Sequence, residues 1–304
     1  MQTAEDKGGA TMLPNPYTPG AGLVPSYLAG REDTMKEAQE AVLSLVHGFP
    51  TRSVVYYGLR GVGKTVLLNK IEEIVEENEV LYEHIEVSER SSFKMAISLH
   101  IQKLIKQLSI KEQAKGIVQK AWAVLKAFKI TYSPEGEVGI GIDGDIVAAA
   151  GVSDTGNFQN DLTELFMAMG NLAQKNERAV CIFIDEIQYL KDDEFEALIA
   201  AIHRLNQRGL PVALFAAGLP KIAGDVKSYA ERLFSFISID SLDQDAALLA
   251  LVEPARKLGV AYTEEAVKEI VALTGGYPYF LQEYGKQVWA FIKDKQIDLA
   301  AVKE

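Results

Sequence analysis

Residues 58–65 read Gly58-Leu59-Arg60-Gly61-Val62-Gly63-Lys64-Thr65, which fits the spacing G-x-x-x-x-G-K-[ST]. The run 53–57 before it is β-branched and aromatic, and the run 66–75 after it carries apolar residues at helical spacing. Strand, glycine-rich loop and helix in this order are the context in which the spacing indicates a phosphate-binding loop rather than a chance turn. The stretch therefore predicts an α/β fold in which a strand leads into a loop at the start of a helix.

The residue types of this loop suit the binding of a phosphate. Glycines let the backbone turn sharply and approach a phosphate without a Cβ in the way. Successive backbone N–H groups then point into one concavity at the positive end of a helix. Lys64 can reach the β- and γ-phosphates as a point charge, and the Thr65 hydroxyl can ligate Mg²⁺. The residues that we expect at the phosphates are Gly58, Arg60, Gly61, Val62, Gly63, Lys64, Thr65 and Val66.

A second motif supplies two carboxylates. Residues 180–184 are all apolar, which is typical of a strand buried on both faces of a parallel sheet, and Asp185 and Glu186 follow them. Ligands bind at the C-terminal ends of the strands in open α/β sheets. We therefore expect Asp185 to partner Mg²⁺ and Glu186 to act as the general base that deprotonates the attacking water. The alternative is that Asp185 and Glu186 form only a solvated acidic turn after the strand. The presence of a phosphate loop in the same chain makes this alternative less favoured.

Composition limits the classes of protein to which the chain can belong. Its 304 residues are 48% hydrophobic and 24% charged, as in ordinary globular proteins, and suffice for one large and one smaller domain. The net charge of −11, without a long Lys/Arg cluster, argues against DNA binding without excluding it. The single cysteine, Cys181, falls in the buried strand and suits a reducing cytoplasm. No long apolar run or signal segment occurs, so we expect a cytoplasmic protein without a membrane segment.

The pattern along the chain predicts three regions. Residues 1–28 are rich in Gly, Pro and Thr and indicate an extended N-terminal arm. Residues 29–240 alternate strands and helices and form the nucleotide-binding core, whereas residues 241–304 read as helices only. The expected strands of the core cover residues 53–57, 80–87, 179–184, 211–218 and 236–239, and the helices between them cover 64–78, 92–109, 159–175 and 192–208.

Residues 111–157 interrupt this alternation. They read as an inserted helix over 115–128, followed by a hairpin of two short strands at 129–133 and 137–142. A loose stretch of small residues follows the hairpin. We therefore expect a helix-and-hairpin insertion in the core.

Together these motifs resemble those of the AAA+ and STAND-type ATPases, and most of all the prokaryotic ATPases related to origin-recognition proteins. Residues 29–32, Ala-Gly-Arg-Glu, are similar to the family's N-terminal GRE box beside the adenine. Residues 58–65 and 182–186 resemble its two nucleotide motifs, Walker A and Walker B. Residues 274–282 resemble the G-x-P segment of its helical lid, and the likeness extends over about residues 16–293.

The resemblance implies a three-layer phosphate-loop NTPase core, with a parallel sheet of strand order 5-1-4-3-2, and a small C-terminal helical lid. It also implies that the acidic strand lies beside the loop strand, so that Thr65 and Asp185 share one Mg²⁺. ATP and ADP are the implied nucleotides, with Arg31 and Pro278 beside the adenine, although the segment around Pro278 is also a plain turn between two helices. No Asn-Lys-x-Asp segment for reading guanine occurs.

The chain also departs from the family pattern. At the end of the fourth strand, where AAA+ proteins carry a polar sensor residue, stand Ala216-Ala217-Gly218, which predicts slow hydrolysis. Arg232 stands where the family often places an arginine finger that reaches a neighbouring subunit, so a homo-oligomer or a partner protein is implied. A solvated arginine at a helix end is an equal alternative. The family further implies a winged-helix or other effector module after Glu304.

Three functions are compatible with these motifs. The first is a molecular switch that binds ATP, hydrolyses it slowly and couples it to closure of the lid or to assembly. The second is a DNA-associated AAA+ ATPase, an origin-recognition-like loader or a transposition helper, which the acidic balance disfavours. The third is a small-molecule kinase, which would need an acceptor pocket for which the sequence shows no signature.

Overall fold

The chain divides into two units in the computed structural model, which describes residues 13–49, 51–109, 115–132, 147–222 and 233–304. Residues 32–240 form one unit, here called the core unit. Residues 1–31 and 241–304 form the other, here called the helical unit.

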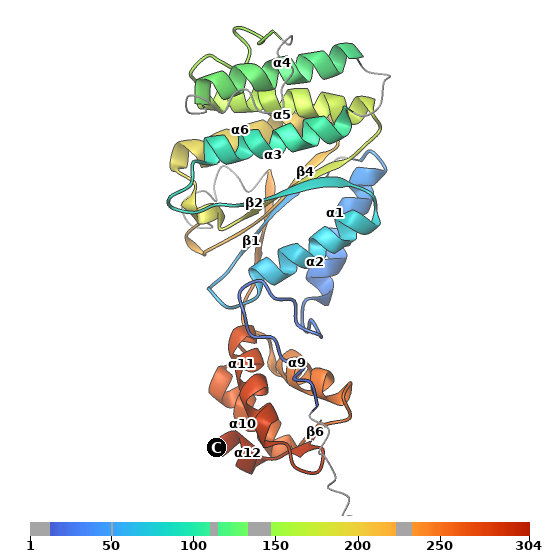
Figure 1. The fold of residues 1–304 in the computed structure, drawn as a ribbon, viewed down its shortest axis with the longest axis vertical. Helices are drawn as coiled ribbons and strands as arrows, with labels where there is room; N and C mark the ends of the chain where they lie inside the picture. Colours follow the sequence, from blue (N-terminus) through green and yellow to red (C-terminus); the bar gives the residue numbers. More distant parts are fainter. Residues whose placement is uncertain (1–12, 50, 110–114, 133–146, 223–232) are drawn as a thin grey trace, which may run out of the picture. The chain divides into compact units, whose positions relative to one another are not determined.

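A parallel sheet is the centre of the core unit (Figure 1). Its five strands are β1 Ser53–Tyr57, β2 Leu81–Glu86, β3 Val180–Asp185, β4 Val212–Gly218 and β5 Phe234–Ser238. Their order is β2-β3-β4-β1-β5, and every neighbouring pair is parallel. The predicted order 5-1-4-3-2 is confirmed, since it is the same order counted from the other edge. Strands β3 and β4 are buried throughout, which is why their sequences are apolar except for Asp185 at the end of β3.

The expectation that the acidic strand lies beside the loop strand is wrong. Strand β4 lies between β1 and β3, with Val55 of β1 paired to Ala216 and Ile184 of β3 paired to the same Ala216 from the other side. Two adjacent strands therefore do not bring Thr65 and Asp185 together, and the expected pairing of these two residues depends on helix α2, which carries Thr65.

Helices cover both faces of this sheet. They are α1 Glu32–Val46, α2 Lys64–Glu77, α3 Phe93–Leu108, α4 Lys115–Tyr132, α5 Phe158–Lys175 and α6 Asp192–Gln207, and the short 3₁₀ turn η2 Ile187–Tyr189 follows β3. Figure 1 shows α1 and α2 on one face and α3, α5 and α6 on the other, with α4 as an outer layer over α5 and α3. One continuous apolar core joins β3 and β4 to α3, α4, α5 and α6. The three-layer α/β architecture is confirmed.

The first strand of the predicted hairpin is wrong, because helix α4 continues to Tyr132. Leu125 and Phe128 are buried at helical spacing, and the Tyr132 ring packs against Phe128 at 4.8 Å between centroids. The Thr131 hydroxyl donates to the Ala127 carbonyl one turn back, as a helical threonine can. β-Branched residues 130 and 131 suggested a strand, but tertiary packing overrode this preference. The second predicted strand, 137–142, lies outside the described residues.

The helical unit has its own core. Its elements are α9 Gln244–Arg256, β6 Ala261–Tyr262, α10 Glu264–Thr274, α11 Pro278–Val288, the 3₁₀ turn η3 Trp289–Phe291, β7 Gln296–Ile297 and α12 Leu299–Lys303. The side chains of Asp243 and Thr263 cap α9 and α10 by accepting from backbone N–H groups. The small parallel pair β6–β7 was not expected from the helical pattern, because each strand has only two residues.

Residues 13–31 form no helix or strand and pack within the helical unit. The Tyr17 ring is buried, its hydroxyl donates to the Leu251 carbonyl at 2.5 Å, and it accepts from the Tyr262 hydroxyl at 2.8 Å. A Cβ at Gly285 would lie 2.5 Å from the Tyr17 ring, so a larger residue at this position of α11 would clash with the ring. None of the helices in the described ranges has the length and apolar character needed to cross a bilayer.

Candidate nucleotide site

The loop between β1 and α2 has a shape that favours glycine at three points. The Gly58 N–H donates to the Gly218 carbonyl at 3.1 Å, and a Cβ on Gly58 would lie 2.0 Å from the Ile239 carbonyl oxygen. Gly61 and Gly63 have φ of 82° and 91°, in the left-handed region, and Gly63 is the N-cap of α2. The pattern G-x-x-G-x-G thus reflects one close backbone approach and two left-handed turns.

Lys64 is the first residue of α2, and its side chain folds back into the loop. Its Nζ donates to the Gly58 carbonyl at 3.0 Å and to the Leu59 carbonyl at 2.8 Å, and the residue is only 8% exposed. Burial lowers the pKa of Lys64, while the charges of Glu186 and Asp185 oppose this shift. The ammonium is therefore a cation held by neutral carbonyls, inside a loop that opens at the N-terminus of a helix.

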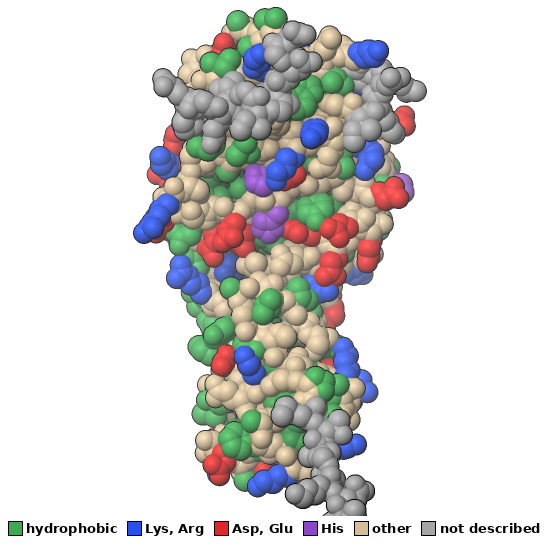
Figure 2. Space-filling view, in the orientation of Figure 1, with side chains coloured by type: hydrophobic (Ala, Val, Ile, Leu, Met, Phe, Trp, Pro, Cys, Tyr) green, Lys and Arg blue, Asp and Glu red, His purple; other side chains and the backbone are tan. Residues whose placement is uncertain are grey.

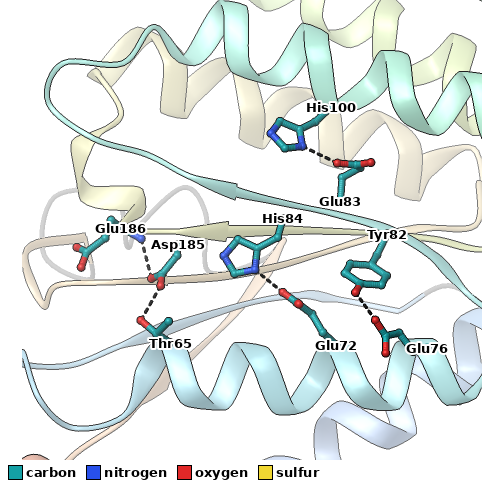
Figure 3. A network of polar contacts seen from close by, with 9 residues as sticks. All are labelled: Thr65, Glu72, Glu76, Tyr82, Glu83, His84, His100, Asp185 and Glu186. Atoms are coloured by element: carbon teal, nitrogen blue, oxygen red, sulfur yellow. Dashed lines mark hydrogen bonds and ion pairs between the residues drawn. The ribbon is translucent and has the colours of Figure 1, made fainter. Parts of the chain in front are cut away.

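Thr65 and Asp185 meet although their parent strands do not. The Thr65 hydroxyl donates to Asp185 Oδ2 at 2.6 Å (Figure 3), because α2 packs across β4, β3 and β2 and carries Thr65 over to the end of β3. Asp185 is buried, and its Oδ1 accepts from the Glu186 N–H at 2.8 Å. Thr65 and Asp185 are therefore in contact, but the path of α2 brings them together rather than two adjacent strands.

The donor set at this point fits Mg²⁺. A hydroxyl and a carboxylate are the hard oxygen ligands that Mg²⁺ prefers, and the ion usually takes one or two protein carboxylates besides phosphate oxygens and water. Within the described residues, no group of three or more His, Cys, Asp or Glu side chains could hold a metal. A magnesium ion at Thr65 and Asp185 would therefore depend on the phosphates of a nucleotide for further ligands.

Glu186 follows β3 in a left-handed conformation with φ 55°. Its carboxylate accepts a hydrogen bond from Gln188 Nε2, and the Gln188 Oε1 accepts from the Leu219 N–H at 3.0 Å, just beyond the end of β4. The Tyr189 hydroxyl accepts from Arg60 of the loop at 3.1 Å. Sequence reasoning missed Gln188 and Tyr189, because in a sequence neither differs from an ordinary surface residue of a turn.

The remaining predicted site residues fall in three places. Val62 is buried, Val66 is half-buried, and the C-terminal end of β4 at Ala216–Gly218 is buried. Arg232 lies outside the described residues. Arg31 and Pro278 belong to the helical unit, so their contacts with the nucleotide remain predictions.

The turn that resembles the G-x-P segment also has a structural reason within the helical unit. Gly276 has φ 73°, and a Cβ there would lie 2.3 Å from the Leu242 carbonyl oxygen. The Leu242 N–H donates to the Gly276 carbonyl at 2.9 Å, and Pro278 occupies the first turn of α11, where its missing N–H costs nothing.

A second polar network extends along β2. Figure 2 shows carboxylates gathered across the core unit with histidines among them, and Figure 3 shows the pairs: His84 with Glu72 of α2, and His100 of α3 with Glu83 at 2.7 Å. Burial pulls the pKa of His84 down, but the hydrogen bond and charge of Glu72, with the charges of Asp185 and Glu86, raise it above its usual value overall.

A sequence model of a protein family, described as the AAA ATPase domain, matches residues 27–215. The match covers more than half of the 304 residues and includes both the loop 58–65 and the acidic end of β3. No curated protein matches the chain.

Solved structures share the fold at low sequence identity. CDC6P from Pyrobaculum aerophilum aligns with a TM-score of 0.58 and 15% identity, over 91% of this chain and 66% of that one. The ORC1 protein of Aeropyrum pernix, solved in complex with DNA, aligns with a TM-score of 0.52 and 14% identity, over 92% and 65%. The Walker-type ATPase paby2304 of Pyrococcus abyssi aligns with a TM-score of 0.52 and 17% identity, over 86% of this chain and 68% of that one. The chain thus spans just under two thirds of the first two proteins, and the likeness concerns the fold, a three-layer α/β NTPase fold.

Proposed function

Because the chain belongs to the AAA ATPase domain family, we propose that it binds ATP with Mg²⁺ at the site described above, hydrolyses it slowly and acts as a nucleotide-dependent switch. The observation that carries the proposal is the bond between Thr65 and Asp185, beside a lysine buried at the N-terminus of α2. Together these groups place a cation, a helix N-terminus and a pair of oxygen ligands around the space where a triphosphate would lie.

The roles follow from the chemistry of each group. Glu186 accepts a proton from water, the water oxygen bonds to the γ-phosphorus, and the bond from that phosphorus to the β–γ bridging oxygen breaks. ADP leaves with the electron pair of that bond, while Lys64 and the loop N–H groups stabilise the negative charge on the phosphates. Thr65 and Asp185 would hold Mg²⁺, which when bound supplies further positive charge to these oxygens.

One feature of the core unit supports a slow switch rather than a fast enzyme. The end of β4 carries Ala216, Ala217 and Gly218, so no polar side chain of this strand can reach a γ-phosphate there. A nucleotide drives a conformational change only if it contacts two states to different extents. Arg31 and Pro278, both of the helical unit, are the proposed contacts through which ATP and ADP would be distinguished by that unit.

Calorimetric titration with ATP and Mg²⁺ tests the proposal on Lys64→Ala. We expect binding to weaken by more than about tenfold, since a hydrogen bond to a charged group contributes about 1.5–3 kcal/mol. The fold should survive, because a lysine at the start of a helix opposes the helix dipole. Lys70→Ala is the matched control, as Lys70 is on the same helix and pairs with Glu73 at 2.7 Å. Equal affinities for wild type and Lys64→Ala would refute the phosphate-loop assignment.

A further inference from the structure

We infer that Gln188 positions Glu186 as the base, an inference that rests on the proposed ATP hydrolysis. The Gln188 carboxamide bridges two elements: its Nε2 donates to Glu186 Oε2, and its Oε1 accepts from the Leu219 N–H at 3.0 Å. It thereby ties the carboxylate after β3 to the backbone after β4. These strands are neighbours in the sheet, so a side chain of this length can span them.

The orientation of this carboxamide is fixed by its partners. A backbone N–H can only donate, so the oxygen of Gln188 must face Leu219. The NH₂ end then faces Glu186, and an ionised carboxylate can only accept. Both ends of the amide are therefore satisfied in one arrangement only, and a flipped amide would place like groups together at both ends.

The space around the carboxamide is closely filled. A Cβ at Gly218 would lie 2.8 Å from Gln188 Oε1, 2.8 Å from Ile187 Cγ2 and 2.2 Å from Ile222 Cδ1. A side chain at position 218 would therefore clash with the Gln188 amide, and glycine leaves room for it. Since Ala216 and Ala217 are apolar as well, Gln188 supplies the polar group at this point from the turn after β3.

The turn that carries both side chains is held in place. Glu186 has a left-handed backbone, which is strained for a residue other than glycine, and its carbonyl accepts from the Tyr189 N–H at 3.0 Å. Ile187 anchors the turn with a side chain that is 1% exposed. Because the amide holds Oε2, the oxygen that would take the proton from water is Oε1.

Steady-state ATPase kinetics of Gln188→Met test the inference, since methionine keeps the length of the side chain and removes the amide. We expect kcat to fall by about tenfold or more. Without the hydrogen bond from Gln188, the Glu186 carboxylate is no longer held in position to take the proton from water. KM, the calorimetric ATP affinity and the unfolding midpoint should stay as in the wild type. Gln188→Asn, one methylene too short to bridge both partners, should show the same loss. Gln207→Met, at the exposed end of α6, is the control.

A double mutant separates positioning from a structural role. In a Glu186→Gln background the base is already absent, so adding Gln188→Met should cause no further loss of turnover. A further loss of turnover in the double mutant would overturn the inference in favour of a structural role. A fall in the unfolding midpoint of both Gln188→Met and Gln188→Asn would do the same. Unchanged kcat in Gln188→Met beside an active wild type would overturn the inference alone. A wild-type chain that neither binds nor hydrolyses ATP would overturn the proposed function, and this inference with it.

Discussion

Tyr56 lies in β1 shortly before the phosphate loop, and its side chain is fully buried. Its hydroxyl has no hydrogen-bond partner in the part of the chain that the structure describes. Burial, with the charge of Glu37 on α1, raises its pKa well above the usual range. An unpaired buried hydroxyl costs free energy, so we predict that Tyr56→Phe leaves the free energy of unfolding unchanged or raises it by up to about 1 kcal/mol.

Urea denaturation measures this effect, with Tyr132→Phe as the matched control. The Tyr132 hydroxyl donates to Asp161 Oδ2 at 2.6 Å, and Asp161 is fully buried, so its loss should destabilise the chain by about 1 kcal/mol or more. A loss in Tyr56→Phe as large as that in the control would show that the Tyr56 hydroxyl is hydrogen-bonded after all.

Glu186 provides a second prediction at this scale. Glu186→Gln keeps the shape of the side chain but cannot accept the proton of water, so we expect turnover to fall by roughly 10²–10⁴-fold with ATP affinity retained. Coupled phosphate release and calorimetry measure the two quantities. Glu196→Gln, an exposed glutamate of α6, should behave as the wild type. Turnover that persists in Glu186→Gln would show that another group is the base.

At the scale of elements, α2 and β2 are joined by the pair His84–Glu72. The pKa of His84 is raised in the folded state, so the pair stabilises the chain below the unfolded pKa of about 6.5 and loses this contribution as pH rises through the folded value. We predict that His84→Gln destabilises the chain more at about pH 6 than at about pH 8.5. Glu72→Gln should lose the same pH-dependent part. An identical loss at both pH values would show that the pair is not an ion pair.

Local signals predicted the elements that carry the chemistry. The loop, the helix after it and the acidic strand each show a pattern within one short stretch of sequence, such as the spacing of Gly58, Gly61 and Gly63. What was missed depends on contacts between distant stretches. The helix α4 continues to Tyr132 because of packing on Phe128, and Gln188 has a role only because Leu219 lies at the end of the neighbouring strand.

At the scale of the whole molecule, the strand order came from a family resemblance, and the inference drawn from it about neighbours failed. Strand β4 separates β1 from β3, and only the path of α2 brings Thr65 to Asp185. The segment 13–31 packs into the helical unit through Tyr17, which a composition rich in Gly, Pro and Thr could not reveal. Long-range pairing of this kind leaves no periodic signal in the sequence.

Net charge bears on the DNA-associated alternative. Phosphate contacts need a basic surface, and the chain carries a net charge of −11. We predict that this chain does not shift duplex DNA in a native gel at about 150 mM salt, with or without ATP. A shift that disappears when salt is raised would restore the alternative function.

The central claim is that Thr65 and Asp185 hold the Mg²⁺ of a bound nucleotide. Its most direct test is the dissociation constant of ATP with and without Mg²⁺, measured by calorimetry for the wild type and for Asp185→Asn. Mg²⁺ should strengthen ATP binding to the wild type and leave binding to Asp185→Asn nearly unchanged, because the charged oxygen ligand is gone. An equal gain from Mg²⁺ in both chains would contradict the claim.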